Sequence, residues 1–246
     1  MDPKLLASFA TVERTHWWFT ARCEILRSVT DRFVPAGGAL LDVGCGTGFF
    51  IESVADRYEA WGVDPSPTAV EMCHQRGLER VVEGSAYDLS AVNGRRFDAV
   101  TFLDVLEHLD EDARALQEAM RVLRPGGVVI ATVPAFMFLW SGHDVVNHHR
   151  RRYRMAQLGA LFRAAGLTLE RLTYFNFYLF GLATMDRLAH RVVPRRTSGE
   201  LRVPPRLVNR LMGDTFLLER KRVADSSRTP YPFGLSILAV GRRTAA

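Results

Sequence analysis

The sequence predicts a doubly wound α/β fold, in which a central sheet carries helices on both faces. Short apolar runs typical of buried parallel strands recur along the chain: ALLDVG, EAWGVD, RVVEG, FDAVTFLD and GGVVIATVP. Segments with helical periodicity lie between them, among them PTAVEMCHQRG and DARALQEAMRVL. This alternation predicts βαβ units and therefore a parallel sheet.

The signals at helix ends agree with this pattern. Ser66 followed by Pro67 is typical of an N-cap and the first helical residue, and Gly77 is placed to end the same helix. The sequence RPGG from Arg124 to Gly127 predicts a helix stop before the fifth strand. Local and periodic signals thus predict the same elements.

The composition fits one domain of this kind. The chain has 246 residues, 48% hydrophobic and 24% charged, which is enough to bury a single large core. Cys23, Cys45 and Cys73 form no CxxC pair, so we expect neither a disulfide framework nor a metal site. The N-terminus lacks a secretory signal, and no stretch reaches about 18 uncharged apolar residues. These features predict a cytoplasmic protein.

The basic charge is uneven. A net charge of +5 could indicate a nucleic-acid partner, but the excess lies in arginine-rich stretches of the second half. No RNA-binding module is appended, and no N/D-P-P-Y motif follows the fourth strand. We therefore expect no nucleic acid, with an RNA-modifying enzyme as the alternative that the charge suggests.

The pattern changes after the fifth strand, near Pro134. The aromatic and basic segment AFMFLWSGHDVVNHHRRRY has the character of a functional loop. A helix, MAQLGALFRAAG, and two strands, LTLERLTYF and FGLSILAVG, complete the fold. Residues 176–232 separate these strands and form an insertion with two expected helices, NFYLFGLATMDRLAHRVV and PPRLVNRLMGDTFLLERKRV. The expected division is an N-terminal helical cap (1–36), a core (37–175 and 233–246) and this insertion.

A glycine-rich turn follows the first strand. DVGCGTG, from Asp42 to Gly48, lets backbone N–H groups approach a ligand at a helix N-terminus. Asp64 ends the second strand, where a carboxylate can accept hydrogen bonds from a ribose diol. A dinucleotide site would need glycine at position 49, which is Phe49. The pattern therefore indicates a nucleoside site of another kind.

With these residues the chain resembles the class I S-adenosylmethionine (SAM)-dependent methyltransferases over most of its length. The matching motifs follow one another in order: DVGCGTG, Asp64, GSAYDL (84–89), LDVLEHL (103–109) and RPGG (124–127). HWWF (16–19) and PFGLS (232–236) further resemble a bacterial subgroup related to the ubiquinone-pathway O-methyltransferases. The resemblance implies a Rossmann-like doubly wound seven-stranded sheet, mostly parallel with an antiparallel last strand. It also implies N-terminal helices, SAM as cofactor and S-adenosylhomocysteine (SAH) as product.

The resemblance also implies cofactor contacts. Ser85 departs from the Asp or Asn often found there, so the adenine contact falls to its hydroxyl or to the Ala86 backbone. Arg22 suits the SAM carboxylate, with a solvated position as the alternative. Trp17 and Trp18 form either a lid over SAM and substrate or an aromatic staple for the first helices. The expected cofactor-binding residues are Arg22, Asp42, Gly44, Cys45, Gly46, Gly48, Asp64, Pro65, Ser66, Ser85, Ala86, Leu103 and Asp104.

The expected chemistry lies beyond the carboxyl ends of the strands, where doubly wound sheets bind ligands. Methyl transfer to a hydroxyl needs alignment, exclusion of water and removal of a proton. His108, His143 and His148 are the predicted bases, and His149 is a further candidate in the same loop, ranked after His143 and His148. His108 has a structural alternative, as a cap or a partner of Glu107, and no spacing demands a metal there.

The loop and the insertion are expected to select the acceptor. Arg151 and Arg152 could bind a carboxylate or phosphate on it, with Tyr153 as partner, or belong to a hydrated surface. The insertion could serve as a substrate lid, a homodimer interface, a docking site for the inner membrane face or a plain helical addition. Its helices and linker carry arginines at positions that include 187, 191, 195, 196, 202, 206 and 210.

These features favour O-methylation of a hydroxyl or carboxyl on a bulky or amphipathic biosynthetic intermediate, whether small-molecule, lipid-like or peptide. N-methylation is the alternative, since an amine acceptor needs little beyond alignment and desolvation. A non-catalytic SAM-binding protein is a further alternative.

Overall fold

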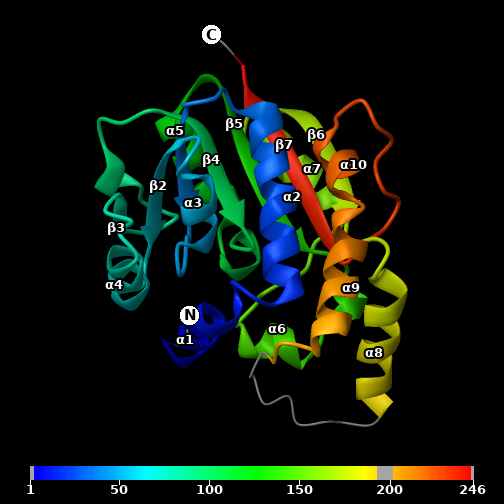
Figure 1. The fold of residues 1–246 in the computed structure, drawn as a ribbon. Helices are drawn as coiled ribbons and strands as arrows, with labels where there is room; N and C mark the ends of the chain where they lie inside the picture. The colour runs from blue at the N-terminus through cyan, green and yellow to red at the C-terminus, as the bar shows by residue number, and fades with distance from the viewer. Residues whose placement is uncertain (1–2, 193–201, 245–246) are drawn as a thin grey trace.

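A seven-stranded sheet forms the centre of the computed structural model, which describes residues 3–192 and 202–244 (Figure 1). The strand order is β3-β2-β1-β4-β5-β7-β6. β7 runs antiparallel to β5 and β6, and the remaining pairs are parallel. This confirms the predicted Rossmann-like, doubly wound fold. The strands are β1 (Ala39–Val43), β2 (Glu59–Asp64), β3 (Val81–Glu83), β4 (Phe97–Leu103), β5 (Leu123–Pro134), β6 (Leu167–Phe175) and β7 (Ser236–Arg243).

Helices cover both faces of the sheet. In Figure 1, α2, α9 and α10 lie in front of it and α5 and α7 lie behind. The α-helices are α1 (Pro3–Val12), α2 (Trp17–Phe33), α3 (Phe49–Val54), α4 (Pro67–Gln75), α5 (Asp112–Val122), α6 (Gly142–Val146), α7 (Met155–Ala164), α8 (Phe180–Val192), α9 (Arg206–Leu217) and α10 (Arg220–Ala224). Short 3₁₀ helices span Ser90–Val92, Leu106–His108 and Met137–Leu139.

The predicted helix ends have the expected geometry. Ser66 caps α4 by accepting a hydrogen bond from the Ala69 N–H, and Pro67 is its first residue. Gly77 follows that helix with φ 78°, in the left-handed region that glycine adopts easily. The RPGG stop lies inside β5, which begins directly after α5 and carries a register shift against β4.

The insertion packs against the N-terminal part of the chain. α2 contacts both α9 and α10, and Asn209 of α9 accepts a hydrogen bond from the Trp17 N–H at 2.9 Å. Phe216, fully buried, packs between Trp17 and Phe175 with ring centroids 6.0 and 6.1 Å away. The second helix expected here is divided in two, α9 and α10, at Leu218 and Glu219. The insertion therefore rests on the N-terminal helices as well as on the sheet.

Part of the insertion lies outside the described residues. This holds for Arg195 and Arg196, and for the side chain of Arg191 near the end of α8. Within residues 3–192 and 202–244, no helix is long and apolar enough to cross a membrane.

Candidate functional site

The glycine-rich turn joins β1 to α3 in a conformation that favours glycine. Gly44, Gly46 and Gly48 have φ angles of 74°, 55° and 77°. A Cβ atom on Gly44 would lie 2.7 Å from Cγ2 of Val105, whereas one on Gly46 would meet nothing closer than 4.0 Å. The turn therefore packs tightly at Gly44 and leaves open space at Gly46.

Asp64 braces this turn from the end of β2. Its carboxylate accepts hydrogen bonds from the N–H groups of Gly46 and Ser66, both at 2.9 Å. Burial raises the pKa of Asp64, against the effect of these two bonds. Each carboxylate oxygen can accept a second bond, so Asp64 keeps capacity for a ribose hydroxyl.

A cavity of about 410 Å³ lies at the carboxyl ends of β1, β4 and β5, beside the glycine turn. It brings together many of the predicted site residues: Trp17, Trp18, Arg22, Asp42, Gly44, Cys45, Gly46, Leu103, Asp104, His108, His143 and Arg152. The others do not line it: Gly48, Asp64, Pro65, Ser66, Ser85, Ala86, His148, Arg151 and Tyr153. Asp64 is joined to it through Gly46.

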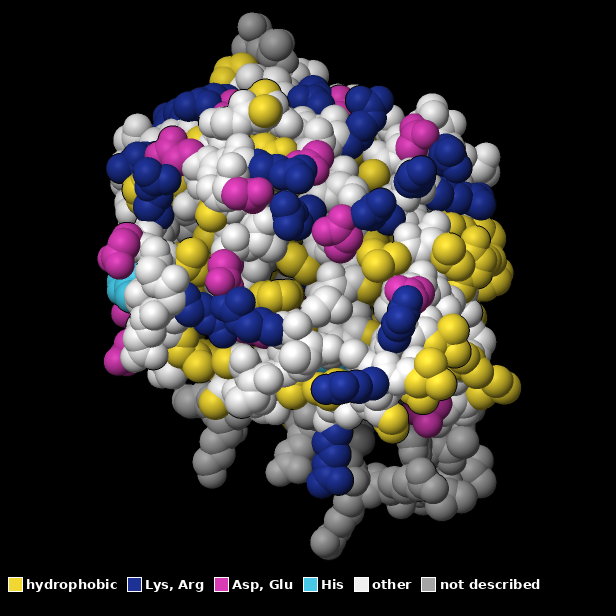
Figure 2. All heavy atoms as spheres, in the orientation of Figure 1, with side chains coloured by type: hydrophobic (Ala, Val, Ile, Leu, Met, Phe, Trp, Pro, Cys, Tyr) yellow, Lys and Arg dark blue, Asp and Glu magenta, His cyan; other side chains and the backbone are white. Residues whose placement is uncertain are grey.

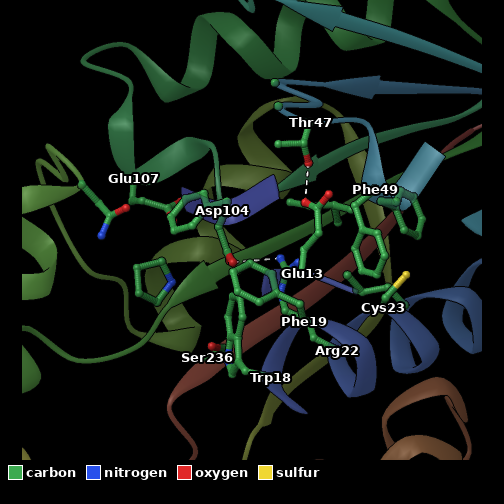
Figure 3. Close-up of a pocket in the computed structure, with 18 of the residues that line it drawn as sticks. Glu13, Trp18, Phe19, Arg22, Cys23, Thr47, Phe49, Asp104, Glu107 and Ser236 are labelled. Atoms are coloured by element: carbon green, nitrogen blue, oxygen red, sulfur yellow. Dashed lines mark hydrogen bonds and ion pairs between the residues drawn. The ribbon is translucent and has the colours of Figure 1, made fainter. Parts of the chain in front are cut away.

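An ion pair crosses one side of the cavity. Nη2 of Arg22, from α2, lies 2.9 Å from Oδ2 of Asp104 and donates to Thr132 at 2.7 Å. The guanidinium also lies 5.2 Å from the centre of the Trp18 ring. Figure 3 shows Arg22 and Asp104 pointing toward each other. Arg22 is thus a charged group of the cavity wall rather than a solvated residue.

Asp42 is a second acidic group on the wall. It accepts a hydrogen bond of 2.5 Å from the Thr101 hydroxyl. Burial raises the pKa of Asp42 to about 7. The carboxylates of Asp42 and Asp104 and the open space at Gly46 are together suited to the amino acid end of SAM.

Asp144, in α6, organises the loop after β5. Its fully buried carboxylate accepts hydrogen bonds from Nε and Nη2 of Arg152, at 2.7 and 2.9 Å, and from the Ser141 N–H at 2.8 Å. Nδ1 of His149 lies 2.9 Å from Oδ1. Burial acts to raise the pKa of Asp144, but the bonds from His149 and Arg152 hold it well below its usual range.

His149 faces the cavity beside two further proton-transfer groups. Its ring lies edge to face with that of His108, at 4.7 Å between centroids. Glu107 is fully buried on the wall, and neither carboxylate oxygen has a hydrogen-bond partner on another residue that the structure describes. Glu107, His108 and His149 offer ligand atoms within 4.8 Å of one another. Such a group is compact enough to share a proton or a divalent cation.

The burial of these groups shifts their protonation. Burial raises the pKa of Glu107 well above its usual value, and nearby Asp104 acts in the same direction. Burial lowers the pKa of His108 to about 4, with a further contribution from His149. His143 is exposed, but the protein around its ring desolvates it in part and lowers its pKa, to about 4. Both histidines are therefore neutral at pH 7.

Other predicted residues have structural contacts. His148 is exposed, with φ 56°, and does not line the cavity that its neighbour His149 lines. The Tyr153 hydroxyl lies 2.7 Å from Oδ2 of Asp112. Arg151 pairs with the same carboxylate at 3.3 Å. These contacts hold the loop to the start of α5.

Several cavity residues were not among the predicted site residues: Glu13, His16, Asn147, Asn176 and Arg187. Glu13 precedes the glycine turn by some thirty residues, yet the Thr47 hydroxyl donates to it at 2.5 Å, as Figure 3 shows. Only His16 belongs to a motif named above, HWWF. No spacing points to the others as cavity residues, because helices and loops that are distant in sequence bring them to the wall.

Comparisons with known proteins concern the family and the fold of this chain. Residues 41–131 match the family model described as a methyltransferase domain. A ubiquinone biosynthesis O-methyltransferase from Xanthomonas axonopodis is 32% identical over 164 residues, which cover 59% of this chain and 69% of the relative.

Solved structures match the fold over most of the chain. A SAM-dependent methyltransferase from Archaeoglobus fulgidus superimposes with a TM-score of 0.60 at 17% identity, covering 93% of this chain and 95% of that one. Another from Thermotoga maritima gives 0.58 at 19% identity, covering 98% and 99%. At such identities the likeness concerns the fold.

Proposed function

This chain belongs to the class I SAM-dependent methyltransferases, and we propose that it transfers the methyl group of SAM to a hydroxyl oxygen, with His149 as the base. SAM supplies an electrophilic methyl group on its sulfonium. The protein then has to position the acceptor, exclude water and take up the hydroxyl proton. The name of the Xanthomonas relative, an O-methyltransferase of ubiquinone biosynthesis, supports the choice of oxygen.

The observation that carries this proposal is the pairing of Asp144 with His149. Because Asp144 remains ionised, it holds the proton of His149 on Nδ1, at 2.9 Å, and leaves Nε2 free to accept one. His149 lines the same cavity as the glycine turn. A carboxylate that orients a histidine in this way also stabilises the imidazolium formed during proton transfer.

The residues around His149 support its assignment as the base. His108 and His143 are neutral at pH 7 and have pKa values of about 4, so they are weak bases. Burial raises the pKa of Glu107 and so favours its protonated carboxyl group. It can donate a hydrogen bond to the acceptor and orient the reacting oxygen. Arg152 donates hydrogen bonds to Asp144 and to the Ala135 carbonyl. Its role is therefore to hold the Asp144–His149 pair in place.

We further propose a bulky or amphipathic acceptor. Aromatic rings of Trp17, Trp18 and Phe19 line the cavity, and Figure 3 shows Trp18 and Phe19 on its wall. Exposed hydrophobic side chains continue outside it on α6, α8 and α9, including Val145 (62%), Leu182 (61%) and Leu211 (65%). Figure 2 shows hydrophobic side chains gathered at the lower right, over α8 and α9. This hydrophobic surface suits an apolar acceptor. It equally suits a membrane or a second copy of the chain that presents the acceptor.

The test compares two adjacent histidines. Asn in place of His149 is expected to lower kcat about 10²–10⁴-fold, as for loss of a general base. His148→Asn is the matched control, because His148 is exposed and Asn tolerates its positive φ. Both variants should bind SAH like the wild type by calorimetry.

The assay uses a panel of phenols and aliphatic alcohols with methyl-labelled SAM. Equal loss in both variants, or none in His149→Asn, would contradict the base assignment. Methylation of amines alone would replace the oxygen acceptor by nitrogen. Loss of activity on dialysis against a chelator, restored by a divalent cation, would assign Glu107, His108 and His149 to a metal instead.

A further inference from the structure

Buried polar atoms without partners gather on the cavity wall. Among the described residues they include both carboxylate oxygens of Glu107, Oδ1 of Asn176 and Nη1 of Arg187. Buried polar groups in folded proteins are nearly always hydrogen-bonded, and an exception calls for an explanation. Several exceptions on one cavity indicate that a ligand completes these hydrogen bonds.

Arg187 is the cation of this set. It lies on α8, within the insertion, and its side chain reaches the cavity that His143, His149 and Arg152 also line. Burial lowers the pKa of Arg187 to about 10, and the neighbouring charge of Arg152 acts in the same direction. The side chain still carries its charge at neutral pH, and that charge in turn lowers the pKa of His143.

Asp144, the buried acid beside Arg152, has no lone pair left to accept a hydrogen bond from Arg187. Asp144 already accepts two hydrogen bonds from Arg152 and one from the Ser141 N–H, and it holds His149. These bonds use the roughly four lone-pair positions of a carboxylate. Asp144 and Asp186 both raise the pKa of Arg187, but Asp144 is committed to other groups and Nη1 of Arg187 has no hydrogen-bond partner among the described residues. Arg187 therefore carries a partly buried positive charge with an unfilled hydrogen bond. Such a charge is costly unless an anion accompanies it.

We infer that Arg187 binds an anionic group, a carboxylate or a phosphate, on the acceptor substrate. The inference rests on the proposed function, since it takes the reacting hydroxyl to lie at His149. The planar fork of a guanidinium matches both anions. Arg151 and Arg152, the residues predicted for this role from the sequence, are paired with Asp112 and Asp144 instead. The acceptor would then be amphipathic, with its anion at Arg187 and its apolar part toward the aromatic wall.

The position of Arg187 gives the insertion a function in this reaction. α8 follows β6 and brings Arg187 to the cavity wall, while Leu182 and Met185 of the same helix are exposed. A single helix thus carries both an anion-binding group and an apolar outer surface. Acceptors without an acid would leave the guanidinium unpaired.

The experiment measures binding of simple anions to the SAH-saturated protein. Benzoate and phenyl phosphate are titrated by ligand-observed NMR, with benzyl alcohol as the neutral analogue. Wild type is expected to bind at least one anion about tenfold more tightly than benzyl alcohol, and Arg187→Met to lose that preference. Arg187→Lys, which keeps the charge without the fork, should retain part of it. Arg206→Met on the exposed start of α9 is the matched control and should behave as wild type.

Each outcome has a defined meaning. Preference for benzoate or for phenyl phosphate identifies the anion. Equal binding of benzyl alcohol, no anion binding at millimolar concentration, or an unchanged preference in Arg187→Met would overturn the inference. So would a tenfold or larger fall in SAH affinity in that variant, because Arg187 would then bind the SAM carboxylate. None of these results depends on methyl transfer, so they are independent of the test of His149.

Discussion

Nδ1 of His149 lies 2.9 Å from Oδ1 of Asp144, a carboxylate with no exposed surface. The same carboxylate neutralises Arg152, which is itself buried. One acid thus serves two purposes, because it orients the proposed base and compensates a guanidinium inside the fold. Function and stability are coupled at this residue.

Asn in place of Asp144 is therefore expected to destabilise the protein strongly. The change keeps the size of the side chain but leaves Arg152 as an uncompensated buried cation, which costs about 3–5 kcal/mol. Urea unfolding followed by circular dichroism measures the loss. Asp110→Asn is the control, since Asp110 pairs with Arg150 on the surface at 2.8 Å and such pairs contribute about 0–1 kcal/mol. Similar effects of the two substitutions would contradict the coupling.

Glu219 predicts a dependence of stability on pH. It is fully buried, and Oε1 accepts the N–H groups of Phe177 and Tyr178 at 2.7 and 3.1 Å, while Oε2 has no partner among the described residues. Burial raises its pKa to about 7 from the ordinary 4.5. Because the folded state holds this proton more tightly than the unfolded state, its contribution to stability falls as pH rises from about 4.5 to about 7.

Glu219→Gln imitates the protonated side chain and should remove this dependence of stability on pH. The melting temperature of the variant is expected to equal that of the wild type near pH 4.5 and to exceed it above about pH 7. The pKa values of Asp42 and Glu107 are also raised, so both proteins share that part of the pH dependence. The quantity to follow is therefore the difference in melting temperature between wild type and Glu219→Gln. Glu111→Gln, at an exposed position, should show no such difference. A constant offset at all pH values would refute the assignment.

The sequence predicted the fold and the cofactor turn because both depend on local patterns. Buried strands and amphipathic helices alternate visibly, and the glycines at 44, 46 and 48 are required by backbone angles within the turn itself. The second helix of the insertion was predicted as one piece and is two. Glu219, between α9 and α10, receives the N–H groups of Phe177 and Tyr178, a tertiary contact that periodicity does not contain.

The acceptor side was less predictable for a similar reason. His143, His148 and His149 are indistinguishable by residue type and spacing, and the choice among them depends on the backbone after α6. His148 has a positive φ and is exposed outside the cavity, while His149 lines it. Arg187 reaches the site from a helix that no motif marks. Tertiary packing, which was not encoded in any short pattern, decides these positions.

The glycine turn allows a prediction that separates folding from cofactor binding. At Gly44 an added Cβ would meet Val105 at 2.7 Å, whereas at Gly46 it would meet nothing closer than 4.0 Å. Both residues have positive φ, which costs an L side chain about 1–2 kcal/mol. Gly44→Ala adds a steric clash with Val105 to this strain. It should therefore lower the melting temperature well beyond the effect of Gly46→Ala.

The two variants should both lose SAH affinity, for different reasons. Gly46 borders the cavity and donates its N–H to Asp64, so a methyl group there projects into the cofactor space of a protein that remains folded. Gly44→Ala distorts the turn itself. Adding Val105→Ala relieves the clash but not the backbone strain, so the double variant should regain part of its stability and remain below wild type. Calorimetry with SAH and thermal unfolding of all four proteins provide the measurements. Unchanged SAH affinity in Gly46→Ala would show that the cofactor does not approach the turn.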